Sequence, residues 1–331
     1  MVSSDRCVVA VVGTTADVPL PAAPEGCELR FITSREQLAS DAADAEVVFA
    51  WEPRLDWIET CWGWSPWLRW IAAATAGVDY LMFPALIDSD VVVTNSAGVF
   101  DGAMAEYALA LVSAVCADLP ATIRLQGRRQ WLHRETRRLA GSEILVLGAG
   151  GIGRAITRLL TSAGANVRCL ARTPRTDPEI GPIAGMASLT GLLPAADFVV
   201  LALPFTPATA GIIGAPELSL LGRDAWIVNL GRGGLIDEPA LTAALAGETI
   251  GGAALDVFST EILREHFVTD ETFALALAEF GERGLVDVIG SLGNFSMLAM
   301  LLNTFQVDLQ AAEPPFPDVR GYAKAAASLG G

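Results

Sequence analysis

The sequence contains few of the residues that most often bind metals or carry catalysis at neutral pH. Its 331 residues include two histidines, and its basic residues are almost all arginine because Lys324 is the one lysine. The five cysteines are widely spaced and form no CxxC pair. Such spacing is typical of buried thiols in a reducing compartment, so we predict no metal site.

Net positive charge and long hydrophobic runs are also missing. The formal net charge of −16 argues against nucleic acid or an anionic membrane surface as a partner. No uninterrupted apolar stretch is long enough to span a bilayer, and "MVSSDRCVVAVVG" at the start predicts a β-strand rather than a secretion signal. We therefore expect a cytoplasmic protein that acts on a small molecule.

Short apolar runs alternate with helical patterns in two series. The first series, from "CVVAVVG" to "VVVTN", ends before residue 96, and the second runs from "EILVLG" to "IGGAALDVF". Between them, "DGAMAEYALALVSAV" predicts a long helix that is followed by an arginine-rich link. The alternation predicts an α/β protein with two doubly wound parallel sheets buried on both faces.

The pattern changes after the second series. From Ile262 the apolar residues recur with a period of 3.6 and no strand signal, which predicts an all-helical segment. We therefore predict a substrate-type α/β domain over residues 1–99 and a dinucleotide-binding Rossmann domain over 100–261. Residues 262–331 would form a helical segment that ends in an irregular tail.

A glycine-rich motif marks the start of the second series. Gly148, Gly150 and Gly153 have GxGxxG spacing and enclose Gly151 and Ile152, after a predicted strand and at the start of a helix. In that context the first glycine allows a tight turn, the second the approach of a pyrophosphate, and the third close helix packing. The motif predicts a dinucleotide site at the helix N-terminus.

The residues after the next strand bear on the choice of cofactor. An acid about 20 residues beyond the glycines would hold a ribose hydroxyl, but the chain has Arg172, Thr173 and Arg175 there, before Asp177. Guanidinium groups pair well with phosphate, which favours NADP(H) and leaves NAD(H) as the other option. The alternative is that these arginines are solvated loop charges.

Five further stretches lie between about residues 68 and 261: "LRWIAAATAGVDYL", "VTNSAGVFDGAMAEYALALV", "ADFVVLALPFTPATAGII", "IVNLGRGGLIDEPAL" and "GGAALDVF". Together they resemble the D-isomer-specific 2-hydroxyacid dehydrogenases. The resemblance implies that the backbone amides of Ala76, Gly77 and Val78 hold a substrate carboxylate. It also places Pro204 and Thr209 in the loop beside the nicotinamide. Reduction of small 2-oxo acids such as glyoxylate or hydroxypyruvate is the activity it implies.

Two further residues have roles that the chemistry itself suggests. Reduction of a 2-oxo acid needs a cation near the carboxylate and the carbonyl oxygen, and Arg232 lies in a Gly-flanked loop after a predicted strand. Asp256 ends its predicted strand and could accept a hydrogen bond from the nicotinamide carboxamide, or cap the next turn.

The sequence departs from the family at the proton donor. The family pairs an acid with a histidine in a downstream Pro-His loop, so that the carboxylate raises the pKa of the imidazole. Glu261 stands at the place of the acid, but no Pro-His follows, and His133 and His266 fit the pattern poorly. We expect an incomplete catalytic set.

The segment after the junction resembles another family. Residues 262–310 are similar to the C-terminal helices of carboxymuconolactone decarboxylase-like proteins, although no cysteine follows Cys169 to supply that superfamily's CxxC. Three hypotheses follow: an impaired 2-oxo acid reductase, a non-enzymatic dinucleotide-binding protein, and a decarboxylase-like function of the tail. For the first we expect a homodimer that acts on a small 2-oxo or 2-hydroxy acid.

Overall fold

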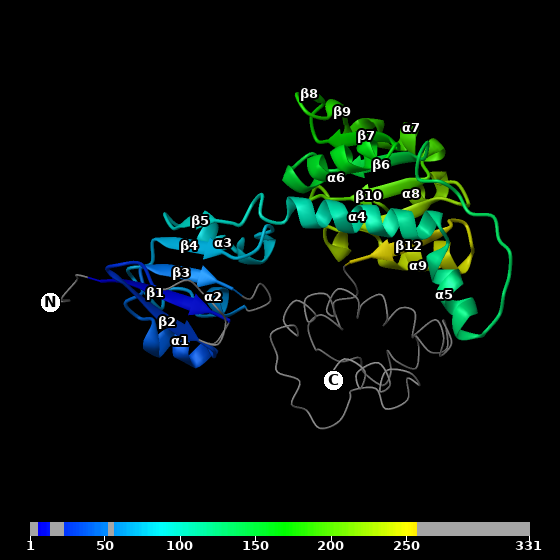
Figure 1. Cartoon of the computed structure of the whole chain (residues 1–331). Helices are drawn as coiled ribbons and strands as arrows, with labels where there is room; N and C mark the ends of the chain where they lie inside the picture. The colour runs from blue at the N-terminus through cyan, green and yellow to red at the C-terminus, as the bar shows by residue number, and fades with distance from the viewer. Residues whose placement is uncertain (1–5, 14–22, 52–55, 257–331) are drawn as a thin grey trace. The chain divides into compact units, whose positions relative to one another are not determined.

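The computed structural model describes residues 6–13, 23–51 and 56–256 (Figure 1). By its contacts the chain divides into two compact units, Met1–Ala274 and Leu275–Gly331. Both sheets belong to the first unit. The predicted helical segment 262–331, with its resemblance to decarboxylase-like proteins, lies outside the described residues.

The first sheet has five parallel strands in the order β2-β1-β3-β4-β5. The strands are β1 (Cys7–Val12), β2 (Cys27–Ile32), β3 (Val47–Ala50), β4 (Trp70–Ala73) and β5 (Val92–Thr94). The helices between them are α1 (Arg35–Asp41), α2 (Trp57–Thr60), the 3-10 helix η1 (Asp79–Leu81) and α3 (Pro84–Ile87). Buried Val and Ile on the strands meet Leu38, Ile58 and Leu86 of the helices in one core.

The second sheet has seven strands in the order β12-β11-β10-β6-β7-β9-β8. They are β6 (Glu143–Leu147), β7 (Asn166–Ala171), β8 (Arg175–Asp177), β9 (Gly181–Gly185), β10 (Phe198–Leu201), β11 (Trp226–Asn229) and β12 (Gly252–Leu255). All neighbouring strands are parallel except β8 and β9, which pair antiparallel. Strand order reverses between β6 and β10, and in open α/β sheets ligands bind outside the carboxyl ends of the strands at such a point.

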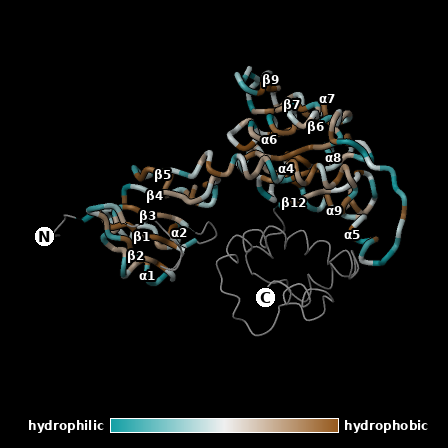
Figure 2. Tube along the Cα trace, viewed as in Figure 1, coloured by the Kyte–Doolittle hydropathy of each residue, from teal (hydrophilic) through white to brown (hydrophobic). Residues whose placement is uncertain are grey.

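Helices cover both faces of the second sheet. They are α4 (Asp101–Cys116), α6 (Gly151–Ser162), α7 (Leu189–Leu192), α8 (Ala215–Leu220) and α9 (Glu238–Ala246). The helix α5 (Leu119–Gly127) follows α4 and buries none of its residues. Alternate residues of one strand face opposite ways: Ile144 and Val146 pack with α4 and α6, whereas Leu145 and Leu147 pack with α7, α8 and α9. Figure 2 shows hydrophobic residues along the strands of both sheets. Burial on both faces explains why inner strands such as β6 and β10 are continuous apolar runs. The prediction of burial on both faces is wrong for β2 and β5, the edge strands of the first sheet, which are partly exposed.

The α/β class, the parallel sheets and the long helix α4 are confirmed. The predicted domain limits at residues 99 and 261 stay predictions. Among the described residues, no single helix is both long enough and hydrophobic enough to cross a membrane. The helices α4 and α5 meet these two criteria only when they are taken together, and the pair is bent by 63°.

Candidate functional site

Two glycines of the turn between β6 and α6 are required by the packing of the chain. Gly148 has a φ of 119°, and a side chain there would overlap the carbonyl oxygen of Ala202, which follows β10. A side chain on Gly153 would overlap the carbonyl oxygen of Gly148 itself. These glycines let α6 and the loop after β10 close on the turn, whatever binds there.

Gly150 differs because nothing lies within 4 Å of where its side chain would be. It is the N-cap residue of α6, so the positive end of the helix dipole is directed toward this open space. A side chain on Gly151 would overlap the carboxylate of Asp101, the first residue of α4. Ile152 packs into the core shared by α4 and α6. The sequence held no signal for Asp101, because it lies 50 residues away from Gly151 along the chain.

The arginines after β7 stand at the entrance to a hairpin that the sequence did not predict. Arg172 and Thr173 are exposed, and Arg175 begins β8. The Nη2 atom of Arg175 donates to the carbonyl oxygen of Ala149, at 3.1 Å, inside the glycine-rich turn. Two guanidinium groups therefore follow β7, and one of them reaches the turn.

Asp177, the first acid after β7, is engaged elsewhere. Its carboxylate accepts hydrogen bonds from the backbone N–H groups of Glu179 and Ile180, at 2.9 and 3.2 Å, and lies 3.0 Å from Nε of Arg154. The bond from Glu179 is the main reason why the pKa of Asp177 is lowered. A buried carboxylate that is held in this way is poorly placed to accept from a ribose hydroxyl.

Arg232 follows β11 in a turn that a buried asparagine fixes. The side chain of Asn229, 1% exposed, accepts from the N–H of Gly231 at 3.0 Å and donates to the carbonyl oxygen of Arg232 at 2.9 Å. A side chain on Gly231 would come within 2.8 Å of the carbonyl oxygen of Leu203, in the loop after β10. The backbone at Arg232 is therefore fixed by contacts on both sides.

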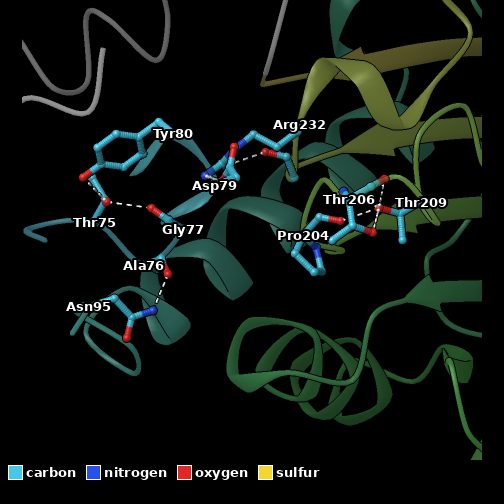
Figure 3. Close-up of polar contacts among 11 residues, drawn as sticks. Thr75, Ala76, Gly77, Asp79, Tyr80, Asn95, Pro204, Thr206, Thr209 and Arg232 are labelled. Carbon is cyan, nitrogen blue, oxygen red and sulfur yellow. Dashed lines mark hydrogen bonds and ion pairs between the residues drawn. The ribbon is translucent and has the colours of Figure 1, made fainter. Parts of the chain in front are cut away.

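The side chain of Arg232 reaches the loop that follows β4 (Figure 3). Its Nε lies 3.1 Å from both carboxylate oxygens of Asp79, and its Nη2 lies 2.9 Å from Oδ1. A side chain on Gly77 would overlap Nη2 of Arg232, so the guanidinium lies directly over this glycine. The structure therefore brings the predicted cation together with the predicted carboxylate loop. Asp79 was missed as a site residue, although it adjoins that loop in the sequence.

The loop itself is held by side chains rather than by its own N–H groups. Oγ1 of Thr75 donates to the carbonyl oxygen of Gly77 at 2.8 Å, and Nδ2 of Asn95 donates to that of Ala76 at 2.6 Å. Within the described part of the chain, the N–H groups of Ala76, Gly77 and Val78 have no acceptor. Three successive unpaired donors beside a guanidinium suit an anion.

The loop after β10 is closed by a threonine (Figure 3). Oγ1 of Thr209 donates to the carbonyl oxygen of Pro204 at 2.7 Å and accepts from the N–H of Thr206 at 2.9 Å. Both residues lie in the loop that the resemblance places beside the nicotinamide, and their bonds within it fix its shape.

Asp256 lies just beyond β12, with its N–H bound to the carbonyl oxygen of Asn229 at 2.9 Å. Its Oδ1 is buried and has no hydrogen-bond partner in the described structure. Burial raises the pKa of Asp256 to about 6, against the opposing charge of Arg232. Burial, and then the charge of Asp256, raise the pKa of Tyr107 on α4 to about 12. A buried carboxyl oxygen that has no partner among the described residues suits an acceptor for an amide donor.

Glu261 and His266 lie outside the described residues, so the predicted place of the catalytic acid is not described. His133, the other histidine, is exposed in the link after α5. The decarboxylase-like hypothesis rests entirely on residues beyond 256.

The site can be compared with known proteins at this point. Residues 109–276, about half of the chain, match the family model of the D-isomer specific 2-hydroxyacid dehydrogenase NAD-binding domain. The chain belongs to this family. Its members are oxidoreductases, and the resemblance predicted from the sequence motifs is confirmed for this part of the chain.

Individual relatives agree with the family. The chain is 36% identical to D-3-phosphoglycerate dehydrogenase of Synechocystis sp. over 199 residues, 58% of this chain and 35% of that protein. It is 28% identical to glyoxylate/hydroxypyruvate reductase HPR3 of Arabidopsis thaliana over 230 residues, 68% of this chain and 69% of that protein. The chain thus spans about a third of the length of the phosphoglycerate dehydrogenase.

A solved structure shares the fold with a TM-score of 0.68. It is NADPH-dependent glyoxylate/hydroxypyruvate reductase SmGhrB of Sinorhizobium meliloti, in complex with NADP and malonate. The two are 27% identical, and the match covers 80% of this chain and 82% of that one.

Proposed function

We propose that the protein is an NADP(H)-preferring reductase of small 2-oxo acids such as glyoxylate or hydroxypyruvate. The observation that carries this proposal is the contact of Arg232 with the loop after β4. A guanidinium lies over Gly77, beside three backbone N–H groups that have no acceptor among the described residues, in a chain whose net charge is −16. In such a chain an anionic substrate needs a local group of donors, and this loop supplies one.

The donors divide between the two oxygen-bearing groups of a 2-oxo acid. The N–H groups of Ala76, Gly77 and Val78 bind the carboxylate, while Arg232 binds a carboxylate oxygen and the neighbouring carbonyl oxygen. Negative charge grows on the carbonyl oxygen as it is reduced, so a fixed cation there stabilises the transition state more than the ground state.

The residues around the glycine-rich turn fit a dinucleotide. The space at Gly150 faces the N-terminus of α6, and a side chain there would fill it. A bound nicotinamide cofactor would supply the hydride. Pro204 and Thr209 shape the loop that would lie beside the ring, and Oδ1 of Asp256, which has no partner among the described residues, would accept from its carboxamide.

The preference for NADP(H) rests on the residues after β7. Arg172, Thr173 and Arg175 offer donors for a 2′-phosphate, and Arg175 reaches the turn. The first carboxylate, Asp177, is bound to backbone N–H groups and Arg154. The Arabidopsis and Sinorhizobium relatives, both named as glyoxylate/hydroxypyruvate reductases, support the substrate class, and the Sinorhizobium protein, named as NADPH-dependent, also supports the cofactor.

The proton donor is the incomplete part of the proposed catalytic set. No Pro-His occurs in the sequence after Glu261, and the loss of a general acid typically lowers the rate by about 10²–10⁴. We propose slow turnover in which water supplies the proton, with Glu261 as the acidic residue of the site.

The same missing histidine favours a second candidate function. If the proton cannot be supplied, the protein would be a non-enzymatic dinucleotide-binding protein with the same cofactor site. Tight NADPH binding without turnover would distinguish this function from a reductase.

The deciding experiment is NADPH oxidation by the full-length protein with glyoxylate, hydroxypyruvate and bulkier 2-oxo acids, with NADH in parallel. We expect turnover with the small acids, faster with NADPH. Arg232→Ala should abolish turnover and leave NADPH binding unchanged. Arg223→Ala is the matched control, because Arg223 is exposed and pairs with Glu248 on the same part of the chain. Activity that survives Arg232→Ala would refute the proposed substrate site.

A further inference from the structure

The guanidinium of Arg232 has two edges, and one of them is already occupied. The side edge consists of the Nε–H and one Nη2–H, and both donate to Asp79, at 3.1 and 2.9 Å. One Nη1–H donates to the carbonyl oxygen of Gly231 at 2.8 Å. Since a guanidinium carries five N–H donors, two remain, one on Nη1 and one on Nη2.

The two remaining donors lie on Nη1 and Nη2, the two nitrogens that make up the end edge of the guanidinium. Among the residues that the structure describes, no acceptor binds them. Donors on these two nitrogens can form a fork that matches two adjacent oxygen atoms. A 2-oxo acid presents such a pair in one carboxylate oxygen and its carbonyl oxygen.

The direction of the fork depends on Asp79. An arginine side chain is flexible, and its backbone anchor at Asn229 fixes only where the side chain begins. Asp79 is the first residue of η1 and directly follows the 75–78 loop, so it ties the far end of Arg232 to the end of the loop that carries the N–H groups. Gly77 leaves room for the guanidinium to lie there.

The ion pair is of little use for the stability of the fold. The side chains of Arg232 and Asp79 are 39% and 30% exposed, and ion pairs with this much solvent around them add little to folding stability. A contact that does little for the fold, and that aims a cation at a group of unpaired donors, has its effect on binding.

We propose that Asp79 is a positioning residue, which holds the side edge of Arg232 so that the end edge faces the substrate. This inference rests on the proposed function and adds to it a residue that acts only through Arg232. It predicts that the carboxylate of Asp79 helps an anionic substrate to bind, although it is itself an anion beside the site.

The test uses Asp79→Asn in the full chain, with two readouts. One is kcat/KM for hydroxypyruvate with NADPH, and the other is the Kd of oxalate for the NADPH complex, since oxalate presents two adjacent oxygens without being reduced. We expect kcat/KM to fall about 10- to 100-fold and oxalate to bind about tenfold more weakly, because a displacement near 1 Å has effects of this size. The Kd of NADPH and the Tm should stay unchanged.

Two companion variants isolate the role. Asp90→Asn removes the same charge from an exposed position between α3 and β5 and should change neither readout. Arg232→Lys replaces the fork by a point charge, and adding Asp79→Asn to it should cause no further loss, because a positioning residue has nothing left to position.

The outcomes separate this inference from the proposed function. If hydroxypyruvate is not reduced but oxalate binds, and binds more weakly to Asp79→Asn, the reductase proposal fails and the role of Asp79 stands. If Asp79→Asn lowers the KM for hydroxypyruvate or the Kd of oxalate, the carboxylate of Asp79 repels the anionic ligand and the inference is wrong. The inference is also wrong if Asp79→Asn leaves both kcat/KM and the Kd of oxalate unchanged, or if it lowers kcat/KM in the Arg232→Lys background as much as in the parent protein. It is equally wrong if the parent protein binds no oxalate.

Discussion

The glycine-rich turn and the 75–78 loop both depend on glycine, but for opposite reasons. In the turn, Gly148 and Gly153 are enclosed by backbone atoms, which cannot move without moving β6, α6 or the loop after β10. In the loop, Gly77 is covered by the end of a flexible side chain, that of Arg232. The comparison teaches that a glycine may be required by the fold or by the site, and that the neighbouring atoms tell which.

The largest effect should come from Gly77→Ala, which disturbs the proposed substrate site and leaves the glycine-rich turn intact. Gly77 has no positive φ, so alanine fits the backbone, but its Cβ would displace the guanidinium of Arg232. We expect kcat/KM for a 2-oxo acid to fall about 10²-fold or more, because the cation leaves its position. The Tm should change little. Gly102→Ala, in open space on α4, is the control, and equal losses in both variants would contradict the argument.

A pair of variants should separate the two kinds of glycine within the turn. Gly153→Ala brings a Cβ against the backbone carbonyl of Gly148, so we expect a loss of about 1–3 kcal/mol of unfolding free energy. Gly150→Ala meets no atom and should stay within about 0.5 kcal/mol while NADPH binding weakens. Urea unfolding and NADPH titration of both proteins measure this, and equal destabilisation would remove the distinction.

The variant Arg172→Asp tests the proposed preference for NADPH over NADH. Reversal of the charge at an exposed residue beside the turn should weaken NADPH binding about tenfold, as the loss of one phosphate contact does, and spare NADH. Fluorescence titration with both cofactors measures the difference. Arg223→Asp changes the net charge equally at a distant exposed position. If NADPH and NADH respond alike to Arg172→Asp, the 2′-phosphate assignment is wrong.

The smallest effect concerns Asp256, whose pKa is raised to about 6 by burial. Because the folded-state pKa lies above the unfolded one, the ionised carboxylate destabilises the fold above pH 6, and this effect disappears toward pH 4. Asp256→Asn should therefore be more stable than the parent at pH 8, on the order of 1 kcal/mol after solvent screening. The difference in unfolding free energy between Asp256→Asn and the parent should be smaller at pH 5. Unfolding curves at both pH values test this, and a constant gap would argue against it.

The sequence predicted the parts of the molecule whose signal is local. Each strand of the two apolar series was foreseen, because short runs rich in apolar and β-branched residues alternate there with helical patterns. The hairpin of β8 and β9 was missed, because "RTDPEIGPIAG" is short, polar and interrupted by proline and glycine. Its pairing depends on the edge of β7, which no local pattern reveals.

For the site, too, the local motifs were predictable and the contacts between them were not. Arg232 and the 75–78 loop stand out in the sequence as separate motifs, but nothing in either indicates the other. Asp79 lies 153 residues from Arg232 along the chain, and Asp101 lies 50 from Gly151. Such pairs exist only once the chain is folded, which is why the motifs were found and the contacts between them were not.

The hairpin has a consequence at the outer limit of the second sheet. A sheet edge exposes unpaired backbone groups to which another chain could add a strand. This edge is β8, three residues long, and it carries Arg175 and Asp177 with Thr176 between them. Short, charged edge strands discourage aggregation. The arginine that reaches the glycine-rich turn thus also lies on the strand at which the sheet ends, where its charge disfavours the addition of another strand.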